Sequence, residues 1–139
     1  MAAQFCTFYL DGALYGLKVE QVQEIVRHQE MTPVPLANAV IAGLINLRGQ
    51  IVSALDLRVR LGLPPRTNGQ LATNVPVRHD DESVSLLVDE IGDVVEVPED
   101  AFEDAPDSVV GQARTLARGV YKLPDKLLHV LDLPAVLFG

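Results

Sequence analysis

Cysteine, tryptophan and long apolar runs are scarce or absent in this sequence of 139 residues. It has one cysteine, Cys6, and no tryptophan, and aromatic residues make up only 5%. A single cysteine cannot form a disulfide within the chain, which suits a reducing compartment such as the cytoplasm. The longest apolar stretch, 37–47, is interrupted by Gly43 and is shorter than the ~20 residues that a membrane-spanning helix needs. The N-terminus lacks the pattern of a signal peptide, so we expect no membrane insertion.

Positive charge is missing from residues 80–107. This stretch carries carboxylates throughout and no Lys or Arg, and the formal net charge of the chain is -8. Such a surface repels the phosphates of nucleic acids and of anionic lipids, which argues against nucleic acid as a partner. The acidic side chains either form solvated loop faces or steer a basic partner.

The hydrophobic content, the length and the short β-prone runs predict one mostly-β domain. Hydrophobic residues make up 48% of the chain, which excludes disorder, and the length suffices to bury a core without metal or disulfides. With so few aromatics, we expect that core to consist of Leu, Val, Ile and Ala. Short β-prone runs alternate with turn signals such as Asp11-Gly12 and Arg48-Gly49, which is typical of an all-β barrel or sandwich. The predicted strands are 5–10, 13–19, 43–47, 50–55, 75–78, 84–88, 94–97, 114–123 and 127–131.

Helices are expected to be short. Asn38 and Asp56 are suitable N-caps, and Pro134 suits the first turn of a terminal helix. Pro76 interrupts the strand 75–78, because proline has no N–H to donate. The predicted helices are 19–26, 38–42, 57–61 and 134–138, with an irregular polar stretch over 99–112.

The residues that usually carry chemistry form no recognisable site in the sequence. His28, His79 and His129 lie far apart, and no Cys or His pair has zinc-ligand spacing. Cys6 lies in an alternating strand, where a thiol is ordinary core material, and no base or orienting group is evident near it. No glycine pattern matches a phosphate loop. We therefore predict no catalytic residues, no metal and no cofactor.

The segment 43–52 has unusual contents. Its strand-forming aliphatics are interrupted by Asn46, Arg48 and Gly49, and the mixture of apolar and charged residues returns at 55–58. An Arg at the tip of a stiff hairpin is either a solvated turn residue or an anchor that donates several hydrogen bonds to a partner. Arg is enriched at interface hot spots, so both interpretations stay open.

Short motifs along the chain, taken in order, resemble those of the CheW family of coupling proteins in bacterial chemosensory arrays. The run Gly43-Leu-Ile-Asn-Leu-Arg-Gly49, followed by Asp56-Leu-Arg58, is the most specific part. Ser53-Ala54 departs from the family, which usually has proline and an aliphatic residue there. The other matching pieces are Tyr15-Gly-Leu17 with Val19, Val22-Gln-Glu-Ile25, Thr32-Pro-Val-Pro35, Leu61-Gly-Leu63, Leu86–Ile91, Val94–Val97 and Leu127–Leu137.

The resemblance implies an all-β fold with two small five-stranded SH3-like β-barrels packed side by side and a few short helices. The two barrels would be subdomains that share a core within a single CheW-like domain over residues 1–139. The implied function is that of a non-catalytic adaptor, cytoplasmic and recruited to membrane receptor arrays. Its expected partners are the cytoplasmic tip of a chemoreceptor (a methyl-accepting chemotaxis protein) and the CheW-like regulatory domain of the histidine kinase CheA.

The resemblance also implies where the partners bind. An apolar cleft between the barrels would take one face of a receptor helix, with Arg48 at the edge of the cleft. Val22 and Ile25 would lie beside it, or would be plain core residues, and Glu24 would pair with Arg48 or with the receptor. The candidate protein-binding residues are Val22, Glu24, Ile25, Asn46, Leu47, Arg48, Gly49, Asp56 and Arg58.

Two other functions compete with this interpretation. A related scaffold in a non-flagellar chemosensory pathway would have the same fold and different partners. A ligand sensor or small enzyme could use the cleft between the barrels, and a pocket with converging titratable residues would favour it.

Overall fold

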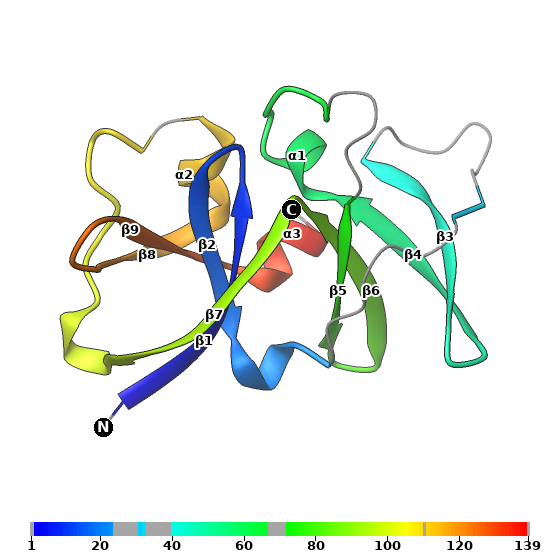
Figure 1. Ribbon diagram of the computed structural model, residues 1–139, viewed down its shortest axis with the longest axis horizontal. Helices are drawn as coiled ribbons and strands as arrows, with labels where there is room; N and C mark the ends of the chain where they lie inside the picture. Colours follow the sequence, from blue (N-terminus) through cyan, green and yellow to red (C-terminus); the bar gives the residue numbers. More distant parts are fainter. Residues whose placement is uncertain (1, 24–30, 33–39, 67–71, 110, 139) are drawn as a thin grey trace.

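The structure is a computed structural model that describes residues 2–23, 31–32, 40–66, 72–109 and 111–138. Within these residues the chain forms two β-sheets side by side, with short helices between and beside them (Figure 1). The N-terminal strands and the C-terminal third of the chain build one sheet, and the middle of the chain builds the other.

The first sheet has five strands in the order β7-β1-β2-β9-β8. Its strands are β1 (Ala2–Leu10), β2 (Ala13–Lys18), β7 (Glu90–Pro98), β8 (Ala117–Lys122) and β9 (Leu127–Leu131). Neighbours pair antiparallel except β2 and β9, which run parallel. The Asp11-Gly12 hairpin between β1 and β2 is confirmed, because both residues have positive φ angles, of 50° and 83°.

The second sheet has four strands among the described residues, in the order β3-β4-β6-β5. Its strands are β3 (Ile41–Leu47), β4 (Gln50–Asp56), β5 (Thr73–His79) and β6 (Glu82–Val88). Two isolated bridges extend it: Val22 pairs with Val77 on β5, and Thr32 pairs with Leu44 on β3. The segment between β2 and β3 therefore contacts both edges of this sheet, as expected if a barrel is closed there.

Short helices join the strands. They are η1 (Val19–Gln21), α1 (Leu57–Arg60), η2 (Glu99–Ala101), α2 (Gln112–Leu116) and α3 (Leu133–Phe138). The prediction for α1 is confirmed, because the carboxylate of Asp56 accepts a hydrogen bond from the backbone N–H of Arg58 at 3.0 Å. The helix predicted over 19–26 is limited to η1 in the described part, because Val22 already pairs with β5.

Two predicted assignments of secondary structure are wrong. Residues 41 and 42, predicted as the end of a helix capped by Asn38, belong to β3, where Ile41 pairs with Leu55; Asn38 itself lies outside the described residues. Residues 114–116, predicted as strand, belong to α2, because Gly111 turns the chain with a φ of 67° and its carbonyl accepts the N–H of Arg114.

Pro76 does not interrupt β5 as the sequence suggested. Because β5 lies at the edge of its sheet, the missing N–H of Pro76 costs no bond in the sheet interior. Pro76 pairs in register with Ser85, and its carbonyl accepts the backbone N–H of Gln23 at 2.9 Å.

The largest core cluster contains side chains from both sheets. Phe8 and Leu17 of the five-stranded sheet pack in one cluster with Leu55 and Leu86 of the four-stranded sheet, and α3 adds Leu133. Aliphatic residues dominate as expected, although aromatic side chains such as Phe8 are also fully buried. This shared core holds the two sheets together and sets the frame on which the candidate site lies.

Candidate protein-binding surface

The β3–β4 hairpin presents Arg48 at its tip. Arg48 and Gly49 form the two-residue turn, with φ angles of 52° and 82°, and Leu47 pairs with Gln50 on either side. Positive φ at both positions is the signature of a type I′ turn, whose twist matches that of the strands. The side chain of Asn46 accepts the backbone N–H of Gly49 at 2.9 Å, which closes the turn. The hairpin therefore holds the exposed Arg48 on a defined backbone.

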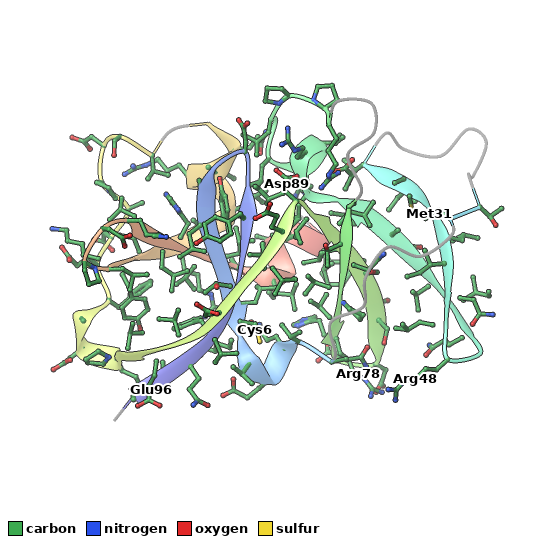
Figure 2. All side chains as sticks on the ribbon, in the orientation of Figure 1. Cys6, Met31, Arg48, Arg78, Asp89 and Glu96 are labelled. Atoms are coloured by element: carbon green, nitrogen blue, oxygen red, sulfur yellow. The ribbon has the colours of Figure 1, made fainter. Side chains whose placement is uncertain are left out.

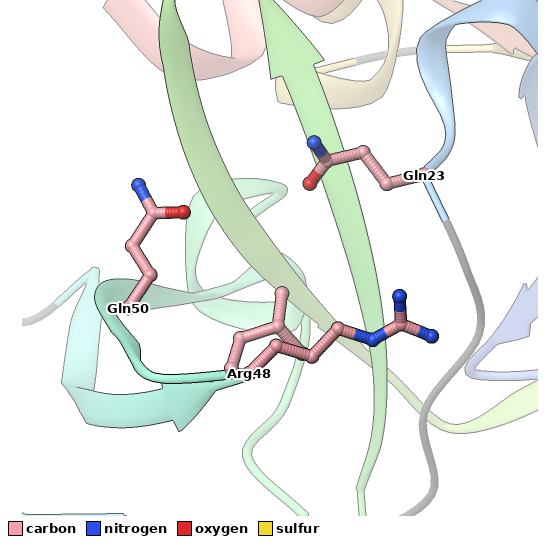
Figure 3. A pocket seen from close by; sticks show the side chains of 4 residues that line it. Gln23, Arg48 and Gln50 are labelled. Carbon is pink, nitrogen blue, oxygen red and sulfur yellow. The ribbon is translucent and has the colours of Figure 1, made fainter.

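A hollow of about 220 Å³ lies beside this turn (Figure 3). It is lined by Leu47, Arg48 and Gln50 of the hairpin and by Gln23 of the segment that follows η1. Figure 3 shows the Arg48 side chain extending from the turn towards the side on which Gln23 lies. The bridge of Val22 to Val77 and the hydrogen bond of Gln23 to Pro76 hold this segment against β5.

The structure thus brings together some of the predicted site residues. Val22 is half-buried and packs against the shared core, next to Gln23 at the hollow, so both of its predicted roles remain open. Asn46 and Gly49 shape the turn, and Leu47 and Arg48 line the hollow. Two other candidates, Glu24 and Ile25, lie outside the described residues.

Asp56 and Arg58 lie elsewhere. Strand β4 runs from Gln50, beside the hairpin turn, to Asp56 at its other end. At ~3.3 Å per residue these ends are roughly 20 Å apart. Asp56 and Arg58 therefore do not share a surface patch with Arg48, although the sequence placed them in one candidate set.

Arg58 belongs to an ion-pair network at this far end. Its Nε and Nη2 donate to Oδ1 and Oδ2 of Asp89 at 2.8 and 2.6 Å, and its Nη1 donates to the carbonyl of Pro64 at 2.8 Å. The Arg58 side chain is only 9% exposed. Arg66 extends the network, since its Nη1 lies 3.0 Å from Oδ1 of Asp56 and its Nε 3.2 Å from Oδ1 of Asp89.

Asp89 is the acceptor at the centre of this network. Besides Arg58, the backbone N–H of Asp11 in the β1–β2 turn donates to its Oδ2 at 2.9 Å. Burial favours a higher pKa for Asp89, but the hydrogen bonds from Arg58 and Asp11 outweigh it, so the pKa of Asp89 is lowered. The hydrogen bond to Asp89 likewise raises the pKa of Arg58. Both groups are therefore charged at neutral pH.

Sequence reasoning did not single out Asp89, Arg66, Gln23 or Gln50. Asp89 carried a usable signal, because a carboxylate directly after the apolar residues 86–88 marks the end of a buried strand. The two glutamines carried no such signal. Gln23, for example, reaches the hollow through the pairing of its segment with β5.

His129 and His79 contact different parts of the fold. Nδ1 of His129 lies 2.8 Å from the carbonyl of Leu14, and the ring of His79 packs 5.8 Å from that of Phe138, whereas His28 lies outside the described residues. Burial raises the pKa of the Cys6 thiol, which disfavours the thiolate. Among the residues that the structure describes, no three His, Cys, Asp or Glu side chains gather in a way that could hold a metal ion, and no helix is long and apolar enough to cross a membrane.

Comparisons with known proteins agree on one family. The family model described as "CheW-like domain" matches residues 4–138. The chain is 35% identical over 130 residues to the chemotaxis protein CheW of Bacillus subtilis (strain 168), covering 94% of this chain and 83% of that protein. It is 30% identical over 134 residues to the chemotaxis protein CheW of Treponema pallidum (strain Nichols), covering 94% and 79%.

A solved structure shows the same architecture. The crystal structure of the scaffolding protein TtCheW from Thermoanaerobacter tengcongensis superimposes with a TM-score of 0.88 at 28% identity, and the match covers 100% of this chain and 94% of that one. The likeness, together with the two sheets, confirms the predicted fold of two small SH3-like β-barrels with a few short helices.

Proposed function

The chain belongs to the family of CheW-like domains and is a coupling adaptor of chemotaxis signalling, and we propose that it joins the cytoplasmic tip of a chemoreceptor to the histidine kinase CheA. Within this proposal the chain acts as one domain whose two barrels share a core. It binds the CheW-like regulatory domain of the kinase and sets the geometry in which receptor and kinase meet. It works in the cytoplasm and is recruited to membrane receptor arrays.

The hollow at the β3–β4 turn is the observation that supports a receptor contact most directly. The type I′ turn presents Arg48 at the hollow, which Leu47, Gln23 and Gln50 also line. An amphipathic receptor helix offers apolar residues at helical spacing and polar groups beside them, and this mixed surface suits such a helix. We propose that Val22, Glu24, Ile25, Asn46, Leu47, Arg48 and Gly49 form or shape the receptor contact.

Asp56 and Arg58 are proposed to contribute indirectly. Their polar groups are engaged with Asp89, Arg66 and the start of α1, so a direct contact with a partner would first have to break these bonds. Their part in binding is to hold the far end of β4 in place.

A single contact of this kind is expected to be modest in size, about 600–800 Å² on each partner. Affinity in an array would then come from many linked contacts. We propose no catalytic step. The hollow of about 220 Å³ at the Arg48 turn is smaller than the ~300 Å³ at which small-molecule sites begin, so we propose no small-molecule site at that turn. A scaffold in a non-flagellar pathway would use the same surface, and its partners would tell the two apart.

The proposal is tested by co-sedimentation with receptor-containing membranes and purified CheA. We expect Arg48→Ala and Arg48→Glu to reduce recruitment of the adaptor by about 5- to 150-fold, the range of a 1–3 kcal/mol hot spot. The matched control is Arg118→Ala on β8, where the side chain is half exposed and lies 3.8 Å from Asp132. Unchanged recruitment of the Arg48 variants, with their folds intact, would contradict the proposed receptor contact.

A further inference from the structure

We propose that Asp89 is a positioning residue that fixes the orientation of the two sheets, and thereby the spacing of the binding surfaces that they carry. The first half concerns the isolated chain and is independent of any partner. The second half rests on the proposed function, because it assumes that receptor and kinase are held at one defined geometry.

The place of Asp89 in the chain is the first argument. Asp89 is the one residue between β6, which ends at Val88 in the four-stranded sheet, and β7, which begins at Glu90 in the five-stranded sheet. Figure 2 shows Asp89 at the seam where the two sheets meet. A connection of one residue leaves few backbone angles in which the sheets could move relative to each other.

The second argument is that Asp89 bonds to both sides of the seam. On the side of the four-stranded sheet, Arg58 from α1 donates hydrogen bonds to both carboxylate oxygens, and Arg66 lies within ion-pair distance of Asp89. On the side of the five-stranded sheet, the backbone N–H of Asp11 donates to the carboxylate. The backbone N–H of Asp89 donates to the carbonyl of Tyr9 in β1 at 3.1 Å.

These bonds favour one orientation of the two sheets, which the shared core does not do. Burial of apolar side chains drives the sheets together but is non-directional, so it fixes their angle weakly. A two-pronged arginine–carboxylate pair has a fixed planar geometry and favours one orientation of its two partners. The Arg58 side chain is 9% exposed and that of Asp89 is 19% exposed, so water screens the pair little.

The clamp is remote from the receptor-facing surface. We call Asp89, Arg58 and the N–H of Asp11 the seam clamp. Strands β4 and β6 run parallel, and the clamp lies where they end, whereas the Arg48 turn lies where they begin. In Figure 2 Asp89 lies in the upper part of the molecule near its centre, and Arg48 lies at the lower right. A change in the clamp therefore does not alter the Arg48 surface by direct contact.

Distance measurement between spin labels on the two sheets tests the first half in the isolated chain. Cys6 is replaced by Ser. Labels are placed at Asp80, in the turn between β5 and β6 of the four-stranded sheet, and at Lys122, in β8 of the five-stranded sheet; their side chains are 89% and 67% exposed. Asp89→Ala, Asp89→Asn and Arg58→Lys are compared with the unaltered clamp. Asp125→Asn is the matched control, because Asp125 pairs with its neighbour Lys126 in the β8–β9 turn.

We expect the distance distribution to broaden or shift by several ångströms in the clamp variants and to stay unchanged in Asp125→Asn. Circular dichroism identifies the variants that keep the fold. Asp89→Asn and Arg58→Lys nearly keep the volume of the replaced side chain, so the distances are compared in these variants if Asp89→Ala unfolds. An unchanged distribution in the folded clamp variants would overturn the proposal.

Kinase assays test the second half. In folded Asp89→Asn or Asp89→Ala chains we expect receptor recruitment within about twofold of the unaltered chain and receptor-dependent CheA activation at least fivefold lower. A purely structural defect would lower both in proportion, and this outcome would overturn the positioning role. If the unaltered chain bound no receptor, the proposed function would fail, while the distance measurement would still decide the clamp.

Discussion

The guanidinium of Arg58 and the carboxylate of Asp89, 31 positions apart in sequence, meet through two parallel hydrogen bonds of 2.8 and 2.6 Å. Arg58 lies in the helix after β4, and Asp89 follows β6. The parallel pairing of β4 with β6 places the ends of both strands side by side, so the residues that follow the two strands can form an ion pair. The contact follows from the topology rather than from any local motif.

Replacing Asp89 by Asn should lower the free energy of unfolding at pH 7 by about 1–3 kcal/mol, because the largely buried Arg58 then lacks its counter-ion. The pKa of Asp89 is lowered in the folded chain. Its contribution is therefore complete above the pKa of the unfolded state, near 3.9, and is lost as the pH falls through the folded pKa.

Urea unfolding at pH 7 and near pH 3 measures this difference. We expect the gap between Asp89→Asn and the unaltered chain to shrink at the lower pH, and Asp125→Asn to show almost no gap at either pH. A gap of equal size at both values would show that the charge of Asp89 is not what stabilises the fold.

Replacing Arg48 by Asn should separate stability from binding. Arg48 has a φ of 52° in the type I′ turn, a conformation that costs most L-residues energy and that Asn adopts more readily. We expect Arg48→Asn to leave the melting temperature unchanged or to stabilise the chain by up to about 1 kcal/mol. Receptor recruitment should nevertheless fall at least fivefold. If recruitment tracked the stability of the hairpin instead, Arg48 would matter only as a turn residue.

Local sequence signals predicted the hairpins and the helix cap. Asp11-Gly12 and Arg48-Gly49 each place two positive-φ residues between β-prone runs, and this pattern depends on neighbouring residues alone. The cap of α1 by Asp56 is local in the same way. The turn that carries Arg48 could therefore be predicted in its backbone as well as in its position.

Pairing between residues that are far apart in the sequence could not be predicted from local patterns. Residues 41 and 42 were predicted to be helical, but the pairing of Ile41 with Leu55 on the neighbouring strand makes them part of β3. The candidate set also placed Asp56 and Arg58 with Arg48, although the whole length of β4 separates them. A strand predicted over 50–55 already implied this distance, but the sequence alone does not assign the two groups of candidates to separate surfaces.

Cys6 is expected to react slowly with alkylating reagents. Its side chain is half-buried, and burial raises the pKa of the thiol, so the thiolate fraction at neutral pH is small. We expect alkylation by iodoacetamide at pH 7.5 to be at least tenfold slower than in the urea-unfolded chain and to accelerate as the pH rises. Mass spectrometry of timed samples measures the rate, and equal rates in the folded and unfolded chains would refute the prediction.

Replacing Gly43 by Ala should weaken the edge of the four-stranded sheet. A Cβ at Gly43 would lie 2.8 Å from the backbone carbonyl oxygen of Thr32, which accepts the N–H of Leu44 at 2.9 Å. Because this neighbour is backbone, the Thr32 segment must move away from β3, at a cost of about 1–3 kcal/mol. Gly16→Ala is the matched control, since its close neighbour is the flexible end of the Leu128 side chain and should yield more cheaply. Urea unfolding compares the two variants, and hydrogen exchange at Leu44 reports the local opening. An equal loss of stability in both, with Leu44 still protected, would mean that the Thr32 bridge adds little to this edge.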